Sequence, residues 1–183
     1  YNAKVNSTGQ LLVATAGSVG PTTTEATESF AKRAYQTSAT TTLGNTQGVD
    51  YPIFYFLNPS GSGKIAYFRN MQFANSVGAS KSVLLRVYSN SQTITGSLLT
   101  PTSMYIGNVA SGRIVTVTYA GASSTTPITS TGILLSSALS TNETAVIDYN
   151  WGLILPPNNS ILITCTPYAN GVGVSINIIW TEV

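Results

Sequence analysis

The chain has 183 residues, which suits one domain that buries about 70 % of the surface of its unfolded form. Only 8 % of its residues are charged, against about 25 % in an ordinary soluble domain. The formal net charge is +2 and the basic residues form no cluster, which argues against nucleic acid as a partner, because its phosphates require a basic stripe. No apolar run approaches the length of about 20 residues that a membrane span needs, and no signal peptide is visible.

Residues 1–48 are predicted to form an extended, Thr- and Gly-rich N-terminal arm. Residues 4–14 indicate a short hairpin, residues 17–27 have the composition of a linker, and residues 29–36 favour one or two helical turns. The arm holds too little apolar surface to offset the entropy lost when it becomes ordered. It nevertheless contains apolar islands, which we predict to be assembly contacts: Leu11, Leu12, Val13, Phe30 and Tyr35.

Residues 51–73 are predicted to form a β-hairpin. The first arm is aromatic and β-branched, the loop that begins at Asn58 is rich in Gly and Ser, and the second arm alternates between apolar and polar residues. Residues 61–64 (GSGK) are similar to part of a phosphate-binding loop. That motif needs a Gly at position 58 and a Ser or Thr at position 65, where this chain has Asn58 and Ile65. The sequence therefore predicts a plain turn.

From residue 49 to the C-terminus, short apolar or alternating runs are separated by turn residues. They predict about eight strands with no helical period between them. This pattern favours an all-β fold, a single antiparallel β-sandwich of jelly-roll type over residues 49–183. Ten residues are predicted to contribute to its core: Phe54, Phe56, Val83, Leu85, Val115, Val117, Ile147, Leu162, Ile176 and Ile178.

Two segments of the strand region, residues 92–99 and 126–135, are similar to each other. Each follows a predicted strand that ends in a tyrosine, Tyr88 or Tyr119. Two related edges of one sandwich would produce such a similarity, and a chance match is the open alternative.

The side chains that carry most enzyme chemistry are scarce. The chain has no His, which removes the commonest general base and metal ligand. Glu143 and Asp148 would lie on opposite faces of one strand, about 17 Å apart, which does not suit a catalytic carboxylate pair. Cys165 lies in an apolar run and is predicted to be a buried small hydrophobe. We therefore predict no catalytic residue, no metal and no cofactor, and a protein that is not an enzyme.

The ten tyrosines and two tryptophans permit two interpretations. Aromatic side chains exposed in a row would stack on sugar rings, which would make the chain a glycan-binding module. Alternatively they fill the sandwich core and subunit interfaces, where aromatic residues are enriched. The second interpretation is favoured.

Four segments resemble a jelly-roll module of tailed-bacteriophage virion proteins of the head-decoration and head-fibre type. They are residues 56–64 (FLNPSGSGK), 86–88 (RVY), 153–163 (LILPPNNSILI) and 177–182 (NIIWTE). Residues 4–13 are similar to the lead-in of such proteins. The resemblance implies a non-enzymatic, trimeric component of the virion surface, whose N-terminal arm binds the major capsid protein or another virion protein. It carries over no catalytic residue.

Two other classes of function remain open from the sequence. One is a subunit of an extracellular filament that assembles by strand addition. The other is a carbohydrate-binding module for attachment to a host. In each case, the low charge and the absence of a disulfide partner for Cys165 favour a homo-oligomer, with a trimer expected.

Overall fold

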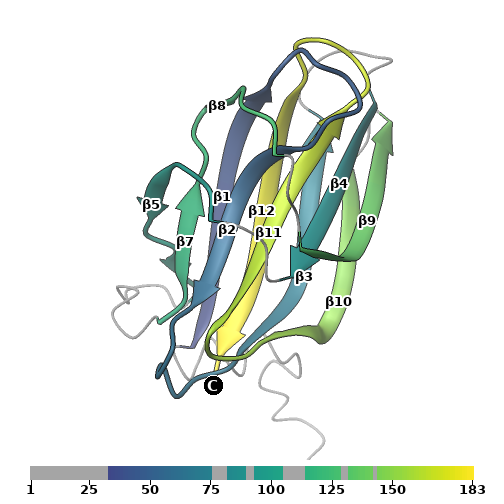
Figure 1. Ribbon diagram of the computed structural model, residues 1–183. Helices are drawn as coiled ribbons and strands as arrows, with labels where there is room; N and C mark the ends of the chain where they lie inside the picture. The colour runs from purple at the N-terminus through teal and green to yellow at the C-terminus, as the bar shows by residue number, and fades with distance from the viewer. Residues whose placement is uncertain (1–32, 76–81, 90–92, 105–113, 129–131, 142–143) are drawn as a thin grey trace, which may run out of the picture.

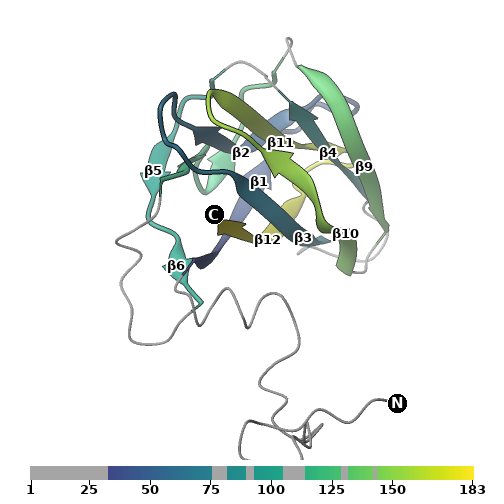
Figure 2. The same ribbon diagram turned by 90° about the horizontal axis from the view of Figure 1, so that it is seen from below.

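The computed structural model describes residues 33–75, 82–89, 93–104, 114–128, 132–141 and 144–183. These residues form twelve β-strands in two sheets that pack against each other (Figure 1), and no helix occurs within the described ranges. The predicted all-β fold, an antiparallel β-sandwich, is confirmed. Figure 2, a view along the strands, shows the two sheets as separate layers.

The first sheet has the strand order β10-β3-β12-β1-β6, and β8 pairs with β1 at its side. All its pairs are antiparallel except β1 with β8, which is parallel. The strands of this sheet are β1 (Ala34–Leu43), β3 (Ala66–Asn75), β6 (Thr102–Ser103), β8 (Ser123–Ser124), β10 (Thr144–Leu155) and β12 (Gly173–Glu182).

The second sheet has the order β5-β7-β2-β11-β4-β9 and is antiparallel throughout. Across the two sheets the long strands pair in a nested order: β1 with β12, β2 with β11, β3 with β10, and β4 with β9. The strands of the second sheet are β2 (Tyr51–Asn58), β4 (Ser82–Ser89), β5 (Ser97–Leu99), β7 (Thr116–Tyr119), β9 (Ile133–Thr141) and β11 (Asn159–Pro167).

The core between the sheets is built from the inward residues of each strand. Phe56 of the second sheet contacts Phe68 and Trp180 of the first edge to face, with ring centroids 5.3 and 5.4 Å apart. Burial of each such side chain contributes about 1.5–3 kcal/mol. Of the ten predicted core residues, nine are buried. Ile147 is partly buried against the core, and Leu162 lies in a second apolar cluster.

The hairpin predicted for residues 51–73 is wrong. Its first arm becomes β2 in the second sheet and its second arm becomes β3 in the first, so the loop between them crosses from one sheet to the other. The apolar strands β11 and β12 pair with these arms instead. Gly61 and Gly63, with φ angles of 75° and 65°, allow the chain to turn there. The Asn58 amide fixes the crossing by donating to the carbonyls of Lys64 (2.8 Å) and Leu155 (2.9 Å).

The boundary predicted at residue 48 also differs from the structure. β1 lies inside the first sheet, between β12 and β6, so this part of the predicted arm belongs to the sandwich. The helical turns predicted up to Gln36 are wrong for their described part, because Ala34 to Gln36 are strand. Threonine explains the difference. It favours strands, and the inward Thr41 satisfies its hydroxyl by donating to the Gly121 carbonyl (2.8 Å).

Candidate functional site

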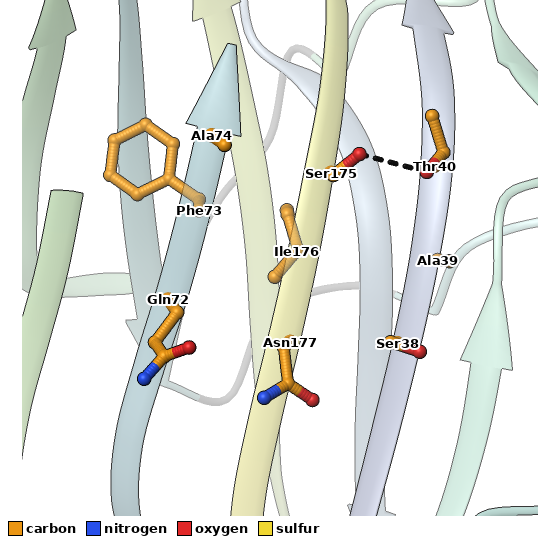
Figure 3. Close-up of a pocket in the computed structure, with 9 residues that line it drawn as sticks. All are labelled: Ser38, Ala39, Thr40, Gln72, Phe73, Ala74, Ser175, Ile176 and Asn177. Atoms are coloured by element: carbon orange, nitrogen blue, oxygen red, sulfur yellow. Dashed lines mark hydrogen bonds between the residues drawn. The ribbon is translucent and has the colours of Figure 1, made fainter. Parts of the chain in front are cut away.

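The outer face of the first sheet carries a hollow of about 470 Å³. The strand register places Asn177 of β12 between Ser38 of β1 and Gln72 of β3, and Figure 3 shows their polar ends side by side. Thr40 and Ser175 share a hydrogen bond between their hydroxyls (2.8 Å). The hollow has no charged lining residue and no His or Cys. It therefore offers neutral hydrogen-bonding groups, and no general base stands among its lining residues to activate the Ser and Thr hydroxyls.

The outer face of the second sheet is partly covered by the chain's own connecting segments. Tyr55, Tyr88 and Leu162 are buried there together with Ile94, and Ile128 packs against them. Ile94 and Ile128 come from the two segments that resemble each other in sequence, so that similarity corresponds to two covers of one apolar cluster. A second hollow, of about 370 Å³, lies beside them, and it is lined mainly by Thr and Ser residues.

A partly buried ion pair between Asp50 and Arg86 links the residue before β2 to strand β4 of the second sheet. Asp50 Oδ1 accepts from the Arg86 guanidinium (2.6 Å) and from the Thr166 hydroxyl, and Oδ2 accepts from the Tyr88 hydroxyl (2.7 Å). Burial favours the neutral form of Arg86, but the hydrogen bond and charge of Asp50 outweigh it, so the pKa of Arg86 is raised. Both oxygens of the carboxylate are occupied by donors of the same chain. This arrangement is that of a structural link.

A second carboxylate lies at the C-terminal end of β12. Glu182 is fully buried. Its Oε1 accepts from the Val115 N–H (3.1 Å) and the Trp180 indole N–H (3.1 Å), and its Oε2 accepts from the Ile114 N–H (2.6 Å). The side chain thus anchors the residues before β7 to the last strand of the other sheet.

Among the described residues, the other groups considered for catalysis form no cluster that could act as a site. Cys165 is completely buried, and burial, followed by the charge of Asp50, raises the pKa of its thiol. This confirms the predicted buried position. Glu143 lies outside the described residues. Within the ranges that the structure describes, no three His, Cys, Asp or Glu side chains gather in a way that could hold a metal ion.

Of the predicted assembly contacts, only Tyr35 falls in the described part of the chain. It is 2 % exposed and packs on Trp180 with ring centroids 5.9 Å apart, so this predicted assembly contact is a core residue of its own chain in the structure. The inward face of β1 takes Tyr35 into the core. Leu11, Leu12, Val13 and Phe30 lie outside the described residues.

Sequence reasoning missed an apolar surface on β9, the strand that ends the second sheet (Figure 1, right-hand edge). Four large apolar side chains of β9 are exposed, and we call them the β9 patch: Ile133, Leu134, Leu135 and Leu139. The consecutive residues 133–135 suggested a strand. The signal that could have found the patch was their lack of alternation, since a strand with one solvent face ordinarily alternates.

A scan of protein-family models found no family that matches the chain, and a search of curated proteins found no match. In the part of the chain that the structure describes, no helix has the length and hydrophobicity to cross a membrane.

Proposed function

We propose that this chain is a non-enzymatic structural subunit of a bacteriophage virion, a capsid-decoration protein or head-fibre subunit at the particle surface. It acts by binding further copies of itself and the major capsid protein or another virion protein. The nested strand pairing supports a jelly roll, the fold that the resemblance of residues 56–64 and 153–163 to phage head proteins implies. No cofactor, nucleic acid or membrane enters the proposal.

The β9 patch is the observation that carries the assembly role. Its members are 43–72 % exposed on one strand, whereas exposed apolar residues on a monomer are ordinarily scattered. The buried carboxylates of Asp50 and Glu182 serve the fold, because their oxygens already accept from donors of the same chain. A contact surface combined with structural polar groups fits a building block of a particle.

The filament alternative shares the requirement for an assembly surface, and it differs in the shape of the product. The glycan alternative has less support. Among the aromatic residues whose side chains are described, Tyr168 is the one that is strongly exposed, at 47 %. A sugar-binding row needs several such side chains on one face.

The test is immunogold electron microscopy with antibodies against the full chain, applied to phage particles and to other extracellular structures from the source culture. Labelling of phage heads is the expected result. Labelling of open-ended fibres would favour the filament, and an absence of label on any phage particle would refute the proposal.

The anchor role of the N-terminal residues is tested separately, by adding protein back to particles that lack it. A variant without residues 1–32 keeps β1 and should fold. We expect it to stay in the supernatant when the particles are sedimented, whereas the full chain sediments with them. Equal binding of both would remove the anchor role and leave the virion role intact.

A further inference from the structure

β9 is the long continuous edge of the described sandwich. The second sheet ends in β5, of three residues, on its other side, and the first sheet ends in β6, of two residues. The remaining edge strand, β10, shifts register between Asp148 and Leu153. β9 has one irregularity near its start and then pairs with β4 without a break over six consecutive residues, from Ser136 to Thr141. Alternate residues of such an edge direct N–H and C=O groups away from the sheet.

This edge lacks the features that ordinarily prevent pairing with another chain. Edge strands are usually protected by Lys, Pro or inward-pointing charges. Residues 133–141 contain neither Pro nor a charged residue. The cation nearest in register is Arg86, opposite Ser137 on β4, and it is paired with Asp50 inside the chain. A second copy therefore meets no net charge at the edge itself.

We propose that β9 pairs antiparallel with β9 of a second copy and extends the second sheet across a dimer. A two-fold axis at Ser137 would place Leu135 opposite Leu139 of the second copy, and by symmetry the same pair would form twice. Both side chains are now substantially exposed, at 43 % and 54 %. The interface is isologous, so a single self-complementary strand satisfies both partners.

The inference rests on the proposed role in assembly and adds the contact by which two subunits join. It also departs from the trimer that the sequence favours, because pairing about a two-fold axis closes after two subunits. The measured mass therefore separates the two arrangements.

The first experiment is sedimentation velocity on the full chain between about 1 and 100 µM. A dimer of the 19.2 kDa chain is the expected species. Leu139→Lys places an unpaired ammonium group against Leu135 of the other copy in each half of the proposed interface, and the cost of removing that charge from water should weaken dimerisation at least about tenfold. The control is Val146→Lys, an equally exposed apolar residue (53 %) on β10 of the other sheet, which should leave the dimer intact. Circular dichroism establishes that each variant is folded.

A second variant tests the register. Ser137→Cys would bring two thiols close to the two-fold axis, where directly opposite Cα atoms of antiparallel strands lie about 4.5–5.5 Å apart, a separation that a disulfide can span. Mild oxidation should give a covalent dimer in high yield, and Ser38→Cys, on the outer face of the first sheet, should not. Cys165 is buried and does not compete.

In the sedimentation experiment, a monomer at every concentration, a trimer, or a dimer that Leu139→Lys leaves unchanged would overturn the inference. In the oxidation experiment, equal cross-linking of the Ser137→Cys and Ser38→Cys variants would overturn it. A trimer would leave the assembly role standing. A β9-dependent dimer whose antibodies label no phage particle would uphold this inference and refute the virion role.

Discussion

The Glu182→Gln substitution tests whether the buried carboxylate holds the sandwich together. Glutamine has nearly the same shape, but one of its two oxygens becomes an NH₂ group. If the remaining oxygen takes the position of Oε1, the Val115 N–H and the Trp180 indole N–H keep their acceptor. The NH₂ group then takes the position of Oε2, which accepts from the Ile114 N–H at 2.6 Å in the native chain. The Ile114 N–H would therefore face a second donor. A hydrogen bond to a charged group contributes about 1.5–3 kcal/mol, and an unsatisfied buried donor costs about 1–3 kcal/mol.

We therefore expect Glu182→Gln to lower the free energy of unfolding by about 2–4 kcal/mol. For a chain of this length that corresponds to a fall in Tm of roughly 5–15 °C. Urea unfolding followed by tryptophan fluorescence is the assay, since Trp180 is fully buried beside the site. The free energy follows from linear extrapolation to water.

Two controls make the result specific to Glu182. Val183→Thr changes the exposed neighbouring residue (52 %) and should alter stability by less than about 0.5 kcal/mol. The loss caused by Glu182→Gln should be the same in low salt and in 0.5 M NaCl, because salt screens buried charges much less than exposed ones. An unchanged urea midpoint for Glu182→Gln would refute the reasoning, and a loss that disappears in salt would place the carboxylate at the surface.

Three further predictions use the same unfolding assay. Asp50→Asn removes the charge partner of Arg86, whose side chain is 27 % exposed, so solvent screening limits the expected loss to about 1–3 kcal/mol; no loss would show that the pair contributes nothing. Gly96→Ala places a Cβ 2.1 Å from the Tyr119 carbonyl oxygen and should cost about 1–3 kcal/mol, whereas Ser97→Ala, at an exposed site, should be neutral. Burial raises the pKa of the Cys165 thiol, so the folded chain keeps the thiol protonated at a pH where the unfolded chain loses the proton. The contribution of the buried thiol to the free energy of unfolding is therefore complete below the ordinary thiol pKa of about 8.5, and it declines above that pH by up to about 1.4 kcal/mol per pH unit. The stability advantage of the native chain over Cys165→Val should thus shrink between pH 8 and pH 10.5, and a constant difference would contradict the assignment.

The faces of the strands could be predicted from the sequence, but their partners could not. Alternation in β12 correctly predicted that Ile176 and Ile178 point into the core. The same reasoning paired β2 with β3 because they are neighbours in the chain, whereas the strongest apolar partners lie about a hundred residues later. The alternation of apolar residues specifies which side of a strand is buried, and the choice among several suitable partners depends on the packing of the whole sandwich.

The hydrogen bonds that Asp50 and Glu182 accept could not be predicted from the sequence for a similar reason. Asp50 and Thr166 are 116 residues apart and Glu182 and Ile114 are 68 apart, and neither pair has a recognisable spacing. The sequence did not predict β1 as a strand, because threonine-rich segments are typical of linkers. In the structure Thr37 and Thr41 of this strand are buried. Exposure of the β9 patch depends on β9 being the last strand of its sheet, and a sequence without the pairing order does not contain that fact.

The outer face of the second sheet gives the strongest argument for a partner. Its register aligns Tyr55, Leu162, Tyr88 and Leu134 in one row across four strands. The first three are at most 7 % exposed, because the segments that carry Ile94 and Ile128 cover them, and Leu134 is 50 % exposed. Within the described residues, the chain's own cover therefore stops between β4 and β9, in the middle of a continuous apolar row. Water is an unfavourable neighbour for either half of that row. The open half of the row lies on β9, the strand that is proposed above to pair with a second copy.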